Sequence, residues 1–325
     1  MNNIELPGIS IVIPAFNAEL YIGTSINSIL NINYPTDKLE LILVDDGSTD
    51  NTVARSKELL HASKYPWQIM QQDNHGPSSA RNKGWQNAKY QWIQFLDGDD
   101  YLHPDKFQIQ GKLAATTTDE VAIIYSPWAR KFDTLKNHDL SEIVVPDLSG
   151  DILVALLKTE GFLQLGCQLF HRVWLEKAGG FNERLYMIED VDLDLRLAMA
   201  GAKFLSAPCE QPLSIYFDRT DSLSKSSRKV FIEGCVRNAR MVEGYWEKNS
   251  GTINNEQKSV LISIYANALS FYAIHDVSSF KQLYAHCRNL APDFKPLNKL
   301  SRYIRPVFGP ETAEIISARL IRVLR

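Results

Sequence analysis

Short apolar runs alternate with stretches of helical spacing along the first hundred residues of the chain. The runs are short, rich in β-branched or aromatic residues and closed by polar turns, which predicts buried strands: Ile9–Pro14, Leu39–Val44, Trp67–Gln71 and Gln91–Leu96. The stretches between them have apolar residues three and four apart or helix-start signals, which predicts helices: Asn17–Asn31, Asn51–His61 and Ser78–Asn87. Strands alternating with helices indicate βαβ units and a parallel sheet.

The pattern changes twice further along the chain. The segment Thr117–Val145 is irregular apart from a strand near Val121–Tyr125, and another strand is expected over Gly161–His171. Short helices are expected over Arg172–Ala178 and Val191–Ala200. After about residue 226 the spacing is helical, with a last helix over Glu311–Leu324. The predicted fold class is α/β, a mostly parallel sheet flanked by helices over 1–226, with a helical region over 227–325.

Composition limits the kinds of protein this chain can be. Its 325 residues are enough for one large domain with an appendage, and a formal net charge of -3 argues against a general nucleic-acid binder. The four cysteines show no metal-binding spacing, and neither a secretory signal nor a run of about 20 apolar residues is present. The sequence therefore predicts a cytoplasmic protein.

Polar residues gather after each of the four predicted strands. These groups are Pro14–Asn17, Asp45–Asp50, Asn74–Pro77 and Asp97–Asp100. In open α/β sheets, ligands bind beyond the carboxyl ends of the strands. Four strand ends with polar chemistry predict a binding site at that edge.

The last of these groups has three carboxylates within four residues, Asp97, Asp99 and Asp100. At ~5 Å and an effective dielectric constant near 20, each close pair costs on the order of 3 kcal/mol. A bound cation, protonation or exposure to water relieves such repulsion. Hard carboxylate oxygens suit Mg²⁺ or Mn²⁺, with a phosphate completing the shell. The alternative is a solvated turn in which Asp99 or Asp100 caps a helix starting near Pro104.

The other groups also allow two interpretations. Asp45 and Asp46 either belong to a turn before a helix or accept hydrogen bonds from a nucleobase or a ribose. Arg81 either pairs with Asp46 or Asp97, or meets a phosphate. Glu189 and Asp190 either complement a helix N-terminus or supply a general base.

Known short motifs exclude several kinds of site. The residues after Gly76 do not match a P-loop, and no G-x-G-x-x-G follows the first strand. The segment Asp97–Gln108 fails as an EF-hand, because Leu102 stands where glycine is required and Gln108 replaces the bidentate glutamate.

Taken in order, five segments resemble the family-2 glycosyltransferases of the GT-A fold. The segments are Val12–Asn17, Val44–Asp50, Gly76–Asn82, Phe95–Asp100 and Gly179–Phe181 followed by Glu189-Asp190. The resemblance covers roughly Ile9 to Ser224. It implies an inverting transfer of a sugar from a nucleotide-diphosphate sugar to an acceptor hydroxyl. Because no membrane span and no motif of processive synthases is present, we expect a non-processive enzyme that adds one sugar to a glycan or lipid-linked precursor.

The resemblance also implies roles for individual residues. A nucleotide-sugar half (about 1–115) would bind the donor, and an acceptor half (about 116–226) would complete the domain. Asp99, with Asp97, would hold Mn²⁺ or Mg²⁺, Asp190 would be the general base, and Glu189 would line the acceptor side. The expected donor-binding residues are Pro14, Ala15, Phe16, Asn17, Asp45, Asp46, Gly76, Arg81, Asp97 and Gly98.

The chain departs from the family pattern in two places. Many relatives carry Tyr-Arg-x-His-x-x-Ser-x-Ser after the base region, whereas Arg219 stands at the position of that histidine here. Arg219 is therefore a possible diphosphate contact. The Gln-x-x-Arg-Trp motif of processive synthases is also missing, since Gln168, Arg172 and Trp174 have the wrong spacing.

Other functions stay open at this stage. A metal-dependent nucleotidyltransferase would also use acidic residues on an α/β sheet, and a non-catalytic nucleotide-sugar-binding module would keep only part of the site. The basic C-terminal tail predicts either a docked helix with a solvated basic face or peripheral contact with the inner face of a membrane.

Overall fold

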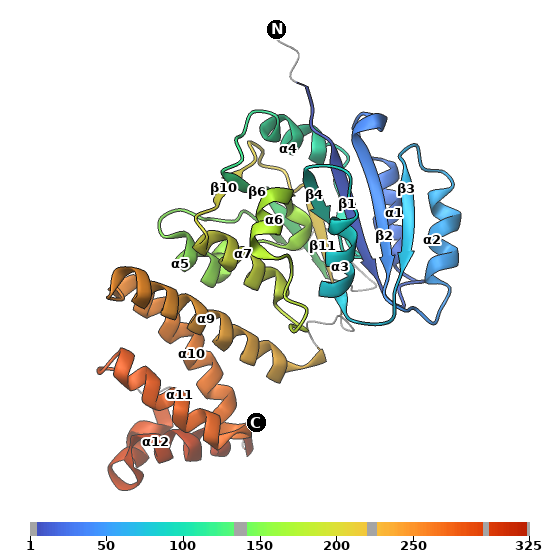
Figure 1. Ribbon diagram of the computed structural model, residues 1–325. Helices are drawn as coiled ribbons and strands as arrows, with labels where there is room; N and C mark the ends of the chain where they lie inside the picture. The colour runs from blue at the N-terminus through green and yellow to red at the C-terminus, as the bar shows by residue number, and fades with distance from the viewer. Residues whose placement is uncertain (1–4, 133–141, 220–225, 295–298, 324–325) are drawn as a thin grey trace. The chain divides into compact units, whose positions relative to one another are not determined.

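The computed structural model describes residues 5–132, 142–219, 226–294 and 299–323. The chain divides into two compact units, Met1–Ser226 and Ser227–Arg325 (Figure 1). The first unit carries all the residues that the sequence suggested for a site.

A seven-stranded sheet forms the centre of the first unit. Its order is β10-β6-β9-β4-β1-β2-β3, with β1 Ile9–Ala15, β2 Leu39–Asp45, β3 Trp67–Gln71, β4 Trp92–Phe95, β6 Val121–Tyr125, β9 Gln168–His171 and β10 Lys203–Ser206. Only β9 runs antiparallel to its neighbours in this sheet. The predicted α/β class with a mostly parallel sheet is therefore confirmed.

Helices cover both faces of this sheet (Figure 1). Helices α1 (Ile22–Leu30) and α4 (Lys106–Ala114) share one hydrophobic cluster with the alternate residues Ile9, Ile11 and Ile13 of β1. Helix α3 (Pro77–Gln86) packs against β1 and β2 on the other face. There Gly84 lies so close to Val12 that a Cβ at residue 84 would be 2.3 Å from Val12 Cγ1. Helix α2 (Thr52–Leu60) packs on α1 and β3.

A smaller four-stranded sheet has the order β5-β11-β7-β8. Its strands are β5 Tyr101–Leu102, β7 Trp128–Phe132, β8 Glu142–Val144 and β11 Ser214–Asp218. Strand β5 follows directly after the Asp97–Asp100 group, and β11 pairs with it in antiparallel orientation. This pairing brings Arg219, at the end of β11, to the acidic group.

In the first unit, three predicted elements differ from the structure by more than one residue at a boundary. Helix α1 begins at Ile22 rather than Asn17, since residues 18–21 form turns. The strand expected over Gly161–His171 is limited to β9, and Leu165–Cys167 forms a 3₁₀ turn. Helix α7 spans Glu189–Met199 and so begins two residues before the predicted helix, at the expected catalytic pair. The other α-helices in the described part of this unit are α5 Ile152–Leu157 and α6 Arg172–Ala178.

The second unit is helical, with α9 Arg228–Ser250, α10 Asn255–His275, α11 Val277–Leu290 and α12 Lys299–Val323. In its interior the buried carboxylate of Glu243 accepts from the Tyr265 hydroxyl at 2.6 Å and contacts His286 Nε2 at 2.9 Å. Helix α12 is broken at Gly309 (φ 74°), so the expected last helix forms its second half. Lys295 of the basic tail lies outside the described residues. Among the helices that the structure describes, none is long and apolar enough to cross a membrane.

Candidate active site

The carboxyl ends of β1, β2, β3 and β4 meet at one edge of the central sheet, because these strands run parallel to one another. Main-chain bonds continue beyond the strands: Asp46 N–H donates to Ala15 O at 2.8 Å, and Gln72 N–H donates to Asp45 O at 3.0 Å. The loops after the strands are thereby held side by side.

The loop after β1 combines an exposed aromatic side chain with a structural amide. Pro14 and Ala15 end the strand, and the side chain of Phe16 beyond them is 50% exposed. Asn17 has a left-handed backbone (φ 47°), and its Oδ1 accepts from Thr49 N–H at 2.8 Å. Asn17 therefore joins the first loop to the second, while Phe16 is left available to a ligand.

The two adjacent carboxylates after β2 have different environments. Asp46 accepts from the main-chain N–H groups of His75 and Gly76, at 2.9 and 2.8 Å, and from the Gln72 side chain at 2.8 Å. Among the described residues, the Asp45 side chain accepts only from the Gln71 side chain, at 3.2 Å, and its buried Oδ1 has no hydrogen-bond partner. Asp46 thus shapes the loop before α3, and Asp45 retains an acceptor for a ligand.

Arg81 connects two acidic groups from distant parts of the sequence. Its Nη2 donates to Asp97 Oδ1 and its Nη1 to Glu189 Oε1, both at 2.7 Å. The Arg81 side chain is 6% exposed and lies over the Phe181 ring. The sequence left open whether Arg81 pairs with Asp46 or with Asp97. The structure shows the pair with Asp97. Asp46 instead accepts from the loop amides.

The three carboxylates after β4 also differ from one another. Asp97 pairs with Arg81, and Asp99 Oδ2 lies 3.3 Å from Arg219 Nη1. Asp100 is buried, accepting from Gln164 Nε2 at 2.8 Å and from Phe217 N–H at 3.1 Å. Burial and the neighbouring carboxylates raise the pKa of Asp100 well above its ordinary value. Gly98, between Asp97 and Asp99, lies close to Ile22, because a Cβ added at residue 98 would be 3.3 Å from Ile22 Cδ1.

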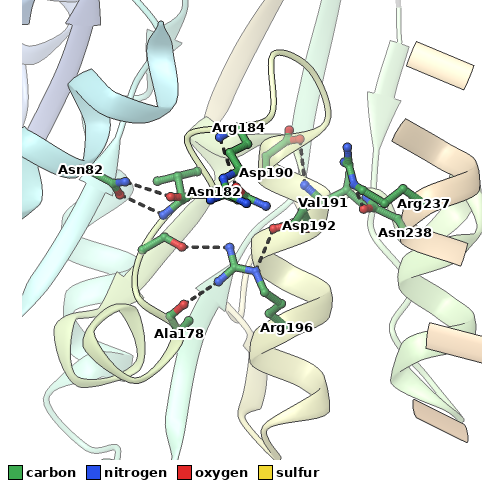
Figure 2. Close-up of polar contacts among 12 residues, drawn as sticks. Asn82, Ala178, Asn182, Arg184, Asp190, Val191, Asp192, Arg196, Arg237 and Asn238 are labelled. Atoms are coloured by element: carbon green, nitrogen blue, oxygen red, sulfur yellow. Dashed lines mark hydrogen bonds and ion pairs between the residues drawn. The ribbon is translucent and has the colours of Figure 1, made fainter. Parts of the chain in front are cut away.

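Helix α7 presents the expected catalytic pair at its first turn. Ile188 precedes it with a left-handed backbone (φ 58°), which is rare for a β-branched residue and typical of functional sites. Glu189 is buried against Arg81. Asp190 is half-buried, and among the described residues its carboxylate accepts a hydrogen bond only from the adjacent Val191 N–H, at 2.8 Å (Figure 2). Burial, and then the charge of Glu189, raises the pKa of Asp190 to about 7.

The Gly179–Phe181 loop is held from two sides, as Figure 2 shows. Asn82 accepts from Phe181 N–H at 2.9 Å and donates to Phe181 O at 2.9 Å. Arg196 donates to the carbonyls of Ala178 and Gly180 at 2.7 and 2.9 Å, and to Asp192 at 2.8 Å. This loop therefore has a structural role, since it fixes α7 relative to α3.

Sequence reasoning missed three residues that contact or adjoin the acidic groups: Tyr21, Gln164 and Asp194. The Arg219 guanidinium lies over the Tyr21 ring, and the Gln164 side chain donates to Asp100. Asp194 is buried one helical turn after Asp190, and burial raises its pKa well above the ordinary value. Among these, only the i, i+4 spacing of Asp190 and Asp194 was visible in the sequence.

A cavity of about 410 Å³ lies at the opposite edge of the sheet. Its lining includes Gly8, Tyr90, Trp92, Thr118 and His171, near the amino ends of β1, β4 and β6. None of the candidate site residues lines it.

The acidic residues fit a divalent cation only in part. Asp97 and Asp99 offer hard oxygen ligands, yet each is paired with an arginine. In the described part of the chain, no group of three His, Cys, Asp or Glu side chains is placed to hold a metal. The side chains therefore suit an ion shared with a ligand's phosphate oxygens and water.

The sequence pattern described as "Glycosyl transferase family 2" matches residues 10–179, which covers four of the five segments and the Gly179 that begins the fifth. The chain belongs to this family. It is 40% identical over 106 residues to an "Uncharacterized glycosyltransferase" of Haemophilus influenzae, covering 33% of this chain and 42% of that protein. It is 31% identical over 210 residues to a "Chondroitin synthase" of Pasteurella multocida, covering 63% of this chain and 20% of that protein. The chain thus spans less than half the length of these two relatives.

Solved structures show the same fold. S. aureus TarS 1-349 in complex with UDP-GlcNAc has a TM-score of 0.61 at 18% identity, covering 96% of this chain and 87% of that one. The mannosyltransferase PcManGT of Pyrobaculum calidifontis, in complex with GDP-Man and Mn2+, has a TM-score of 0.52 at 16% identity, covering 97% and 87%. The predicted GT-A-type fold of this chain is therefore confirmed.

Proposed function

We propose that this chain is an inverting, non-processive glycosyltransferase that moves one sugar from a nucleotide-diphosphate sugar to an acceptor hydroxyl. Membership of family 2 supports the reaction class. The observation that carries the proposal is Asp190, a half-buried acid with a pKa of about 7. Through Glu189 and Arg81 it is linked to Asp97 at the edge where the donor is expected.

The donor would bind over the ends of β1, β2 and β4, in the nucleotide-sugar half (about 1–115). Phe16 offers an exposed ring to the base, and the unpaired oxygen of Asp45 can accept from a base N–H or a ribose hydroxyl. Asp46, Asn17 and Gly76 would act indirectly, by holding these loops in place. The nucleotide-sugar complexes of TarS and PcManGT support a donor of this class.

In the proposed reaction, the Asp190 carboxylate removes the proton of the acceptor hydroxyl. The acceptor oxygen forms a bond to the anomeric carbon while the bond from that carbon to the diphosphate oxygen breaks on the opposite face. The nucleoside diphosphate leaves, the proton stays on Asp190, and the configuration inverts. A base with a pKa near 7 suits this step, because it is both ionised and basic enough at neutral pH.

Asp99, with Asp97 nearby, would hold Mn²⁺ or Mg²⁺ together with the donor's phosphate oxygens. Such an ion stabilises the negative charge of a leaving diphosphate. Arg219 is placed beside Asp99, so its guanidinium adds positive charge at the same position.

The acceptor half (about 116–226) would bind a glycan or a lipid-linked precursor.

Helix α12 supports peripheral contact with the inner face of a membrane, because Arg305, Arg319 and Arg322 are exposed along it. Flotation with anionic liposomes would test this contact. Replacing Arg319 and Arg322 with glutamate should abolish binding, and unchanged flotation would contradict the contact.

A screen of nucleotide sugars with and without Mn²⁺ tests the proposed reaction. We expect one donor to release a nucleoside diphosphate, identified by chromatography, at a rate increased by the acceptor. Release of pyrophosphate from a nucleoside triphosphate would instead identify a nucleotidyltransferase. Binding of a donor without turnover in the presence of candidate acceptors would favour a binding module.

A further inference from the structure

Arg219 pairs with the carboxylate that is expected to bind metal. Arg219 follows β11 and Asp99 follows β4, and their Nη1 and Oδ2 atoms are 3.3 Å apart. The ring of Tyr21, from the loop before α1, lies against the guanidinium. Three separate segments of the chain therefore build the environment of this cation.

Arg219 is the better buried member of the pair. Its side chain is 11% exposed, whereas that of Asp99 is 31% exposed and therefore partly solvated. A guanidinium in such a position is costly to leave without a counter-charge, because desolvation is only offset by a nearby anion. A divalent ion that binds Asp99 takes away part of this counter-charge, since one carboxylate then serves two cations.

A nucleotide diphosphate can compensate for that loss. Its oxygens accept bidentate hydrogen bonds from arginine and are themselves ligands for Mg²⁺ or Mn²⁺. When metal and diphosphate bind together, the diphosphate supplies enough negative charge to compensate both the metal ion and Arg219. When the metal arrives alone, it has to compete with Arg219 for Asp99.

On the basis of the proposed function, we propose that Arg219 competes with the divalent metal for Asp99 and transfers to the diphosphate when the nucleotide binds. Metal binding without nucleotide is then weak, and the nucleotide strengthens it. By reciprocity, the metal strengthens nucleotide binding by the same factor. Because of Arg219, the metal binds tightly at Asp99 only when the donor is also bound.

Manganese titration of the full chain tests this competition, with free Mn²⁺ measured by electron paramagnetic resonance. Titrations are made alone, with UDP, with GDP, and with uridine or guanosine as phosphate-free controls. In the wild type we expect the cognate diphosphate to tighten Mn²⁺ binding by about tenfold or more, and the nucleosides to leave it unchanged. Asp99→Asn should lose Mn²⁺ binding in every condition.

Two variants separate charge from geometry. Arg219→Gln removes the competing cation, so Mn²⁺ alone should bind about fivefold or more tighter, and the effect of the diphosphate should shrink accordingly. Arg219→Lys keeps the charge, so its binding of Mn²⁺ alone should stay near that of the wild type. Circular dichroism establishes that each variant is folded, and the lysine variant provides the comparison if the glutamine variant is not.

The outcomes distinguish this inference from the proposed function. If the wild type binds a diphosphate and Arg219→Gln binds Mn²⁺ alone no tighter than the wild type, the competition is wrong and the proposed function stands. A lysine variant whose binding of Mn²⁺ alone differs from that of the wild type by fivefold or more also contradicts the competition. If no nucleoside diphosphate binds the wild type with or without Mn²⁺, both the proposed function and this inference are contradicted.

Discussion

Arg81 donates a 2.7 Å hydrogen bond to Glu189, although the two residues are 108 positions apart in the chain. The same guanidinium bonds Asp97 through its other terminal nitrogen. One buried side chain therefore fixes the end of β4, where the donor is expected, relative to the first turn of α7, where the proposed base lies. Glu189 and Asp97 are held in their relative positions by this shared contact.

Arg81→Met should destabilise the first unit. Removing one partner of a buried ion pair leaves the other charge uncompensated, which typically costs about 3–5 kcal/mol. Asp97 is 33% exposed and will be partly solvated, so we expect about 3 kcal/mol. Urea unfolding followed by circular dichroism measures the change. Arg55→Met removes an exposed pair with Glu58 and should cost less than about 1 kcal/mol; equal losses in the two variants would contradict a structural role for Arg81.

The same substitution should change the pH dependence of turnover. The positive charge of Arg81 lowers the pKa of Asp190, while the negative charge of Glu189 raises it. Without the guanidinium, Asp190 should bind its proton more tightly, and the acid limb of the rate profile should move above its wild-type midpoint of about 7. An acid limb that stays in place would show that Arg81 does not act on the base.

Asp194→Asn should stabilise the protein increasingly as pH rises. Burial raises the pKa of Asp194 in the folded state above the unfolded value of 3.8, so ionisation disfavours folding. The wild type therefore loses stability as pH increases from about 4 through the folded pKa, while the asparagine variant does not. Gln168 Nε2 can still donate, at 3.2 Å in the wild type, to the asparagine oxygen. Urea unfolding at pH 4.5 and pH 8 measures the difference in free energy of unfolding between the variant and the wild type. A difference that shrinks toward pH 8 would contradict this prediction.

Two helical glycines should respond in opposite directions to alanine. Gly84→Ala places a Cβ 2.3 Å from Val12 Cγ1, and such overpacking typically costs about 1–3 kcal/mol. Gly244→Ala, in α9, meets nothing within 4 Å and should gain about 0.5–1 kcal/mol from the higher helix propensity of alanine. Thermal unfolding of the two variants measures both effects. A stable Gly84→Ala protein would mean that α3 moves freely away from β1.

The sequence was sufficient for most strands of the central sheet, but it did not predict β10 or the strands of the smaller sheet. Continuous apolar runs such as Ile9–Pro14 identified the central strands, because strands buried on both faces need such residues. Apolar residues around Leu163 also suggested a strand, yet Leu165–Cys167 forms a 3₁₀ turn, and the Gln164 side chain before it donates to Asp100. Periodicity does not distinguish a buried turn from a short strand.

The candidate site was predictable as a set of strand ends, whereas the partner of each residue was not. Asp45 and Asp46 look equivalent in the sequence, but only Asp46 accepts from the loop amides before α3. The ion pair between Arg81 and Glu189 depends on packing between distant segments of the chain, and the residues next to either one in the sequence do not predict it. The same holds for Arg219, whose contact with Asp99 depends on the pairing of β11 with β5.

The central claim, that Asp190 is the base of a sugar transfer, is tested most directly by the turnover of Asp190→Asn with the cognate donor and acceptor. We predict a fall of about 10²–10⁴-fold, loss of the acid limb near pH 7, and donor affinity equal to that of the wild type. Asp73→Asn, which removes an exposed carboxylate from the neighbouring loop after β3, should turn over like the wild type. Wild-type turnover by Asp190→Asn would contradict the account.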